Sequence, residues 1–180
     1  PNTTMYGRIT TECWGTDGSE REGQAGYGLC IDHLHTCDIR ARVKGRQTVN
    51  RAEALAVLHS LLVTKPQRNG ELILYIDSQV TIDGMAKMWD KTYDKFRVRK
   101  DTANYSIFKA IQAIRERFLF GSNYSVRTIK INAHQYDRTP MHMIADRGGR
   151  LNKQADELAK QGRDLQTGLH QPFHHCAKAV

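Results

Sequence analysis

The chain has 180 residues, 39% of them hydrophobic, and its formal net charge is +8. This length fits one ordinary domain with a real core, and no apolar run approaches the roughly 20 residues that span a bilayer. The sequence thus argues against a membrane partner, and its basic balance favours a polyanion, nucleic acid first.

The chain holds four cysteines, Cys13, Cys30, Cys37 and Cys176. They show neither a Cys-x-x-Cys pair nor the spacing of a disulfide framework. Reduced cysteines fit a reducing compartment, so we expect an intracellular protein of the cytoplasm or nucleus. The first residue is Pro1 and not methionine, and we expect a trimmed chain or a piece released from a longer one.

Three strands are predicted before any helix, as in an antiparallel meander. Residues 5–16 and 25–34 form the first two, and residues 38–44 alternate apolar with charged side chains like a half-exposed third strand. Asp17-Gly18 follows the first strand, which predicts a hairpin that carries the Asp17 carboxylate where strand gives way to turn. Taken alone, an Asp-Gly pair indicates only a turn.

The rest of the chain alternates helices with strands. Residues 51–63 are apolar nearly all round and predict a largely buried helix with Glu53 in its first turn. Residues 71–76 are a continuous apolar strand that ends at Asp77, and functional groups gather beyond the carboxyl ends of such strands. The remaining predicted elements are helices over 80–89 and 105–118, a strand over 126–133, a loop over 135–151 and a helix over 152–160.

Four carboxylates therefore fall at the ends of different elements: Asp17, Glu53, Asp77 and Asp156. If these groups converge, they repel one another, and such a cluster persists only if a cation neutralises it. Oxygen ligands without a thiolate select magnesium or manganese. Two such ions about 4 Å apart can activate a water and stabilise a leaving oxygen in phosphoryl displacement.

These carboxylates lie in blocks that together resemble type 1 ribonuclease H. The blocks, in chain order, are Thr16-Asp17-Gly18-Ser19 with Gly26-Tyr27-Gly28, then Arg46-Gln47-Thr48-Val49-Asn50-Arg51-Ala52-Glu53, then Tyr75-Ile76-Asp77-Ser78-Gln79, then His134, and finally Asn152-Lys153-Gln154-Ala155-Asp156-Glu157-Leu158-Ala159. The resemblance runs from about Met5 to Gly162. It implies an α/β ribonuclease H-like fold, in which a mixed five-stranded sheet is flanked by helices. We accordingly expect a catalytic domain over residues 1–162 and a polar, flexible tail over residues 163–180.

The resemblance also implies the activity and its residues. It implies a monomeric endonuclease domain that cuts the RNA strand of RNA–DNA hybrids and leaves 3′-hydroxyl and 5′-phosphate ends. Asp17, Glu53, Asp77 and Asp156 match the ligands of two Mg²⁺ ions, which Mn²⁺ can replace, and His134 matches a mobile histidine that assists proton transfer or product release. The matching nucleic-acid contacts are Ser19, Arg46, Thr48, Asn50, Gln79 and Asn152. The basic cluster of Lys95, Arg97, Arg99 and Lys100 either joins these contacts or is a solvated face.

The sequence departs from the family pattern at two places and leaves two alternatives open. Val49 stands where the family often has an asparagine that contacts an RNA 2′-hydroxyl. The connection from His134 to Asp156 is also longer than usual, which makes His142 a rival histidine.

One alternative function is a catalytically silent scaffold within a reverse transcriptase or polyprotein, and the other is a related polynucleotidyl transferase. All four carboxylates are present, which favours an active nuclease. The loosely spaced histidines and Cys176 of the tail do not predict a zinc site.

Overall fold

We describe residues 11–32, 38–89, 103–119 and 123–166 in a computed structural model of the chain. Five strands form one mixed sheet in the order β3-β2-β1-β4-β5. Strands β1, β2 and β3 pair antiparallel, and β4 pairs in parallel with both β1 and β5. The strands are β1 (Thr11–Arg21), β2 (Gln24–Ile31), β3 (Ile39–Arg42), β4 (Glu71–Ile76) and β5 (Ser125–Lys130).

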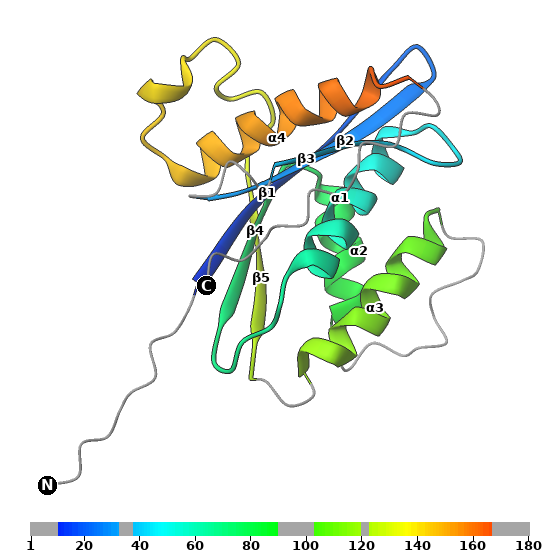
Figure 1. The fold of residues 1–180 in the computed structure, drawn as a ribbon, viewed down its shortest axis with the longest axis vertical. Helices are drawn as coiled ribbons and strands as arrows, with labels where there is room; N and C mark the ends of the chain where they lie inside the picture. Colours follow the sequence, from blue (N-terminus) through cyan, green and yellow to red (C-terminus); the bar gives the residue numbers. More distant parts are fainter. Residues whose placement is uncertain (1–10, 33–37, 90–102, 120–122, 167–180) are drawn as a thin grey trace, which may run out of the picture.

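Helices cover both faces of this sheet (Figure 1). Helices α1, α2 and α3 lie on one side, and α4 crosses the other side over β1 and β2. Within the described residues, no helix has the length and apolar character that a membrane crossing requires. The helices are α1 (Val49–Val63), α2 (Gln79–Trp89), α3 (Tyr105–Leu119) and α4 (Arg147–Arg163). The predicted fold class, a mixed five-stranded sheet flanked by helices, is confirmed.

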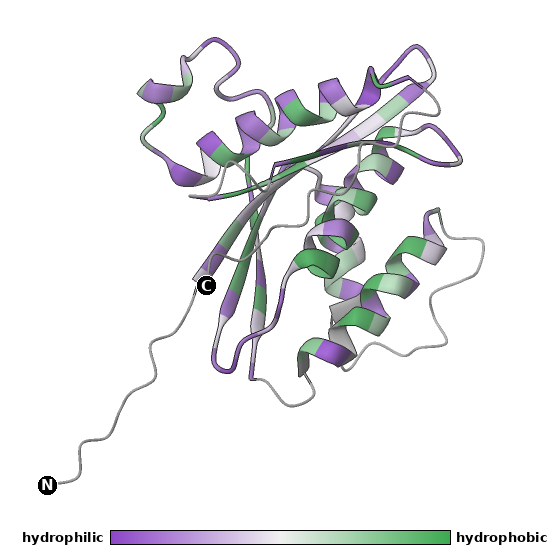
Figure 2. Ribbon diagram, in the orientation of Figure 1, coloured by the Kyte–Doolittle hydropathy of each residue, from purple (hydrophilic) through white to green (hydrophobic). Residues whose placement is uncertain are grey.

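The core explains why β4 is apolar without interruption. Its residues Leu72, Leu74 and Ile76 are fully buried against α1, α2 and α3, while Ile73 packs with Leu151 on the α4 side. Successive strand residues face opposite sides of a sheet, so a strand covered by helices on both sides is apolar at successive positions, as β4 is after Glu71. In Figure 2, β4 is mostly hydrophobic, whereas α4 carries both hydrophilic and hydrophobic residues.

Strand β1 continues beyond the predicted turn at Asp17-Gly18. Its pairing with β2 runs on to Arg21 opposite Gln24, and the chain reverses at Glu22 and Gly23, which have φ values of 53° and 75°. Asp17 therefore lies within a central strand and not at a strand-turn junction. The prediction was wrong because an Asp-Gly pair is compatible with a turn, but ladder pairing to β2, which continues from Asp17 to Arg21, outweighs that local preference.

Helix α4 begins at Arg147, five residues before the predicted start. The Asp146 side chain caps it by accepting a hydrogen bond from the Gly149 amide at 2.7 Å. The Gly148-Gly149 pair, which the prediction placed in a loop, lies in the first turn of the helix, where a Cβ on Gly148 would come within 2.6 Å of the Tyr75 ring. Close packing therefore accounts for these glycines. The connection before α4 contains one 3₁₀ turn at Met141–Met143.

Candidate active site

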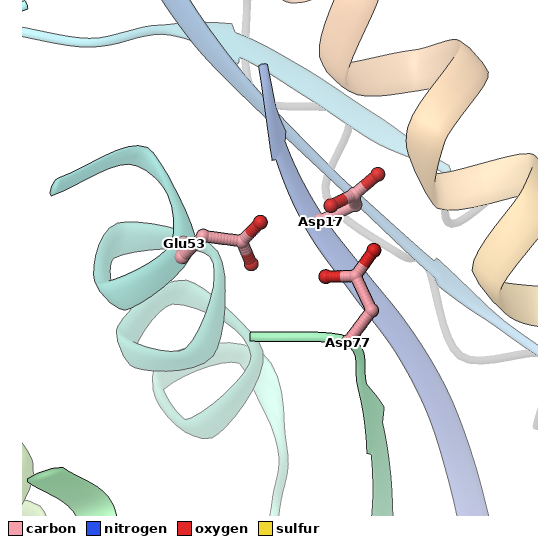
Figure 3. Close-up of side chains that lie close together, drawn as sticks. All are labelled: Asp17, Glu53 and Asp77. Carbon is pink, nitrogen blue, oxygen red and sulfur yellow. The ribbon is translucent and has the colours of Figure 1, made fainter. Parts of the chain in front are cut away.

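Three acidic side chains converge from three different elements. Asp17 comes from the middle of β1, Glu53 from α1 and Asp77 from the residue after β4 (Figure 3). One carboxylate oxygen of each residue lies within 4.8 Å of one oxygen of the other two. Asp17 and Glu53 are each only 4% exposed, whereas Asp77 is half-buried, so two of the three carboxylates are held away from bulk water.

Backbone pairing and close packing bring these carboxylates together. Thr16 pairs with Ile76 in the parallel β1–β4 ladder, so the next residues, Asp17 and Asp77, leave the ladder side by side. Gly18 lets α1 approach the strand, because a Cβ at that position would lie 2.7 Å from the Glu53 backbone nitrogen. The site therefore follows from the sheet register and from one residue that lacks a side chain.

Burial raises the pKa of all three carboxyl groups, and repulsion from neighbouring carboxylates adds to the shift at Asp17 and Glu53. Burial is the largest cause of the raised pKa of Asp17, followed by the charge of Glu53 and then that of Asp77. Burial also raises the pKa of Glu53, partly offset by a hydrogen bond with Asp17, and it raises the pKa of Asp77. Nearby cations oppose such shifts, so a cation between these groups would restore their charged forms.

The donor set fits a hard divalent cation. All three side chains offer oxygen, which Mg²⁺ and Mn²⁺ prefer. Glu53 Oε2 is buried and has no hydrogen-bond partner among the described residues, and a buried acceptor without a partner is costly unless something else satisfies it. The cluster and this orphaned oxygen together indicate a cation site.

Asp156, the fourth predicted ligand, lies near this cluster but outside the group of three. It projects from α4 and forms an ion pair with Lys160, with Lys160 Nζ 2.6 Å from Asp156 Oδ2. It still lines a pocket shared with Asp17 and Asp77, and its charge contributes to the raised pKa of Asp17.

His134 lines the same pocket as Asp17, Asp77 and Asp156. Its side chain is 67% exposed, and its Nδ1 lies 3.0 Å from Asp137 Oδ2. The residue has a φ of 58°, in the left-handed region that a non-glycine residue rarely adopts. The rival His142 lies in the 3₁₀ turn and is not among the residues that line the pocket. The geometry favours His134.

The predicted nucleic-acid contacts lie at several places around the cluster. Thr48 is the N-cap of α1 and accepts a hydrogen bond from the Arg51 amide at 3.3 Å. Ser19 accepts one from Arg163 at 2.9 Å, and Gln79 donates one to Asp83 at 2.8 Å. Arg46 and Asn50 are exposed on either side of Thr48, and Val49 is 44% exposed. Asn152 lies beside Asp77 and lowers its pKa. Lys95, Arg97, Arg99 and Lys100 lie outside the described residues.

Sequence reasoning missed two lysines at this site. Lys130 donates hydrogen bonds to the backbone carbonyls of Asp77 and Ile131, and its charge lowers the pKa of Asp77. Lys153 lines the pocket from α4. A signal existed for Lys130, because it ends the strand parallel to β4 and pairs with Ile76, next to Asp77. A lysine inside a helical block carried no such signal for Lys153.

The comparisons with known proteins agree with one another. The RNase H family model matches residues 10–164. Ribonuclease H1 of Mus musculus is 28% identical over 156 residues, and that of Homo sapiens is also 28% identical over 156 residues. Each of these alignments covers 85% of this chain but 48% of the relative, so the chain spans about half the length of the curated relatives it matches.

Solved structures show the same fold at lower sequence identity. The N-terminal RNase H domain of a Mycobacterium tuberculosis protein has a TM-score of 0.55 at 18% identity, covering 86% of this chain and 94% of that one. The prototype foamy virus protease–reverse transcriptase has a TM-score of 0.57 at 21% identity, covering 86% of this chain and 21% of that one. These likenesses establish the fold alone.

Proposed function

The chain belongs to the RNase H family, and from this premise we propose that it is a metal-dependent endonuclease that hydrolyses the RNA strand of RNA–DNA hybrids. The convergence of Asp17, Glu53 and Asp77, with an orphaned Glu53 oxygen at its centre, is the observation that carries the proposal. A scaffold without catalytic function has no reason to keep three converging carboxylates of which two are buried, since burial of a charged group disfavours folding.

Asp17, Glu53 and Asp77 would hold Mg²⁺, and Asp156 would complete a second site once it leaves Lys160. When bound, two Mg²⁺ ions, or Mn²⁺ in their place, would supply Lewis-acid activation of a water and stabilise the leaving oxygen, giving 3′-hydroxyl and 5′-phosphate ends. The chain's own contribution is to fix the carboxylates through the β1–β4 register before substrate arrives, which avoids reorganisation during the reaction.

His134 would handle a proton on the solvent side of the site. It lines the pocket, and its Nδ1 faces Asp137, so Nε2 is the ring nitrogen that would meet a substrate. A carboxylate at one ring nitrogen orients the imidazole. Protonated His134 would then donate to the leaving oxygen or help release the cleaved phosphate.

The hybrid would lie across the ends of α1 and α2 that flank the cluster. Arg46, Thr48 and Asn50 stand at the start of α1, and Gln79 begins α2. Arg46 would neutralise a phosphate, whereas the neutral side chains would contact sugars and base edges. We propose that the chain acts as a monomeric domain, either alone or as part of a larger reverse transcriptase or polyprotein.

Cleavage of an end-labelled RNA–DNA hybrid in Mg²⁺ tests the proposal. We expect Asp17→Asn and Asp77→Asn to abolish cleavage while the protein stays folded, because an amide supplies no charge to the cation. Glu157→Gln, on the exposed side of α4, is the matched control and should cleave like the wild type. A wild-type protein that folds and binds hybrid but does not cleave would establish the silent scaffold instead, and cleavage of duplex DNA would favour a polynucleotidyl transferase.

A further inference from the structure

The turn that carries His134 is fastened to α4 through one side chain, Lys153. Lys153 Nζ donates hydrogen bonds to three backbone carbonyls of this turn, those of Tyr136 at 2.9 Å, Asp137 at 3.2 Å and Thr139 at 2.7 Å. An ammonium group has three N–H donors, so these contacts account for its full donor capacity. We propose that Lys153 is a positioning residue that holds the His134 turn over the carboxylate cluster.

The contacts form a continuous path from α4 to the histidine. Lys153 binds the carbonyl of Asp137, and the Asp137 carboxylate in turn contacts His134 Nδ1 at 3.0 Å. Two backbone hydrogen bonds lie within the turn itself. The Asp137 amide donates to the His134 carbonyl at 3.3 Å, and the Thr139 amide donates to the Tyr136 carbonyl at 3.0 Å. Since His134 has a left-handed φ, which is unfavourable for a non-glycine residue, contacts from outside the turn must stabilise its conformation.

The same helix also presents the groups that bear on the cluster. Asn152, Lys153 and Asp156 all line the pocket from α4, and α4 is seated on β1 by contacts that leave no room for a Cβ at Gly15. Through Lys153 and α4, the position of the His134 turn is therefore fixed relative to the sheet that carries Asp17. A ring contact adds to this arrangement, because Tyr136 lies against Gly149 in the first turn of α4.

Charge-assisted hydrogen bonds of this kind are stronger than those between neutral groups. A lysine whose donors are all taken by backbone carbonyls has little capacity left for a phosphate. Lys153 should consequently affect turnover through His134 and not the affinity for the hybrid. This inference rests on the proposed role of His134 in turnover, and the experiment is designed to separate the two.

Lys153→Met keeps the aliphatic stem and removes the three donors. Amide hydrogen exchange in the metal-free protein should show lost protection at Asp137 and Thr139, with α4 unchanged beyond its first turns. On the hybrid substrate, kcat should fall about tenfold with KM nearly unchanged, because a displaced acid loses part of its roughly 10²–10⁴-fold contribution. Lys109→Met is the control, because Lys109 contacts Gln112 on the remote helix α3, and it should change neither readout.

A double-mutant cycle with His134→Ala decides whether Lys153 acts through the histidine. In the His134→Ala background, Lys153→Met should cause no further loss of kcat; an equal loss in both backgrounds overturns the inference. A raised KM at constant kcat also overturns it, since Lys153 would then contact the hybrid. If His134→Ala alone leaves kcat unchanged, the proposed role of the histidine fails, whereas unchanged exchange at Asp137 and Thr139 shows specifically that Lys153 does not hold the turn.

Discussion

Glu53→Gln should make the metal-free protein more stable, although it removes a residue that we place in the active site. Two unit charges no more than 4.8 Å apart repel by at least roughly 3.5 kcal/mol at an effective dielectric constant of about 20. Glu53 can escape this repulsion by binding a proton, which from an ordinary pKa of 4.5 costs about 3.4 kcal/mol at pH 7. Both ways of accommodating the charge therefore oppose folding by about 3 kcal/mol.

Glutamine keeps the shape of the side chain and removes that charge. Its amide could donate to Asp17 or Asp77, whose oxygens lie within 4.8 Å, so the new donor need not stay unpaired. We expect the free energy of unfolding at pH 7 in EDTA to rise by about 1–3 kcal/mol, which for a domain of this size is a rise of roughly 2–12 °C in Tm. Urea denaturation measures this, with Glu157→Gln as an exposed control that should change stability by less than about 0.5 kcal/mol.

The pH dependence supplies a second measurement. Because burial raises the folded-state pKa of Glu53 above its unfolded value of about 4.5, the folded state holds a proton that the unfolded state releases from about pH 4.5 upward. As far as this group is concerned, the stability of the wild type in EDTA should be greatest below about pH 4.5, fall as pH rises through neutrality, and level off above the folded-state pKa of about 8. Glu53→Gln should have a shallower slope.

Magnesium should reverse the order of stability of the wild type and Glu53→Gln. A cation that binds only the folded state stabilises it, so Mg²⁺ should raise the Tm of the wild type more than that of Glu53→Gln. If Glu53→Gln is no more stable than the wild type in EDTA, and the Glu157→Gln control is neutral, then repulsion within the cluster is not a significant cost and the argument from buried charge is refuted.

Further predictions concern packing, the histidine and the basic surface. Gly28→Ala should destabilise the fold by more than about 3 kcal/mol, measured by urea denaturation, because its Cβ would lie 2.5 Å from the Ala155 carbonyl oxygen of α4; a loss below 1 kcal/mol would show that α4 can shift freely. His134→Ala should lower kcat and spare hybrid affinity, whereas His142→Ala should do much less in the same steady-state assay; the opposite order would exchange their roles. Arg46→Ala should weaken hybrid binding and reduce the slope of log K against log salt by about 1, and an unchanged slope would remove it from the phosphate contacts.

Much of the site was predictable because its signals are local. The apolar run before Asp77 marks a strand buried on both faces, and the helix that contains Glu53 is evident from its composition and from its cap at Thr48. Once each carboxylate is placed on an element, the parallel arrangement of β1 and β4 is enough to suggest that Asp17 and Asp77 meet. Periodicity and capping depend on residues a few positions apart, and the sequence displays them directly.

The remaining features depend on contacts between distant residues. Only the tertiary structure shows that β1 continues through Asp17, because the partners that extend its ladder lie on β2. It likewise shows that α4 begins at Arg147, since the cap at Asp146 and the packing against Tyr75 and Tyr136 favour helix where two glycines alone favour a loop. Each glycine in a helix costs about 1 kcal/mol relative to alanine, and a few such contacts offset this cost.

The contacts of individual side chains are the feature that is hardest to predict from the sequence. Lys153 and Lys160 stand in the same helical block with the same chemistry, yet one binds three carbonyls of the His134 turn and the other pairs with Asp156. A long flexible side chain can reach many acceptors, and the one that it reaches is fixed by how α4 lies on the sheet. The sequence by itself thus determined the elements and the acidic residues of this protein, whereas the packing of α4 decided which lysine binds the His134 turn and which one pairs with Asp156.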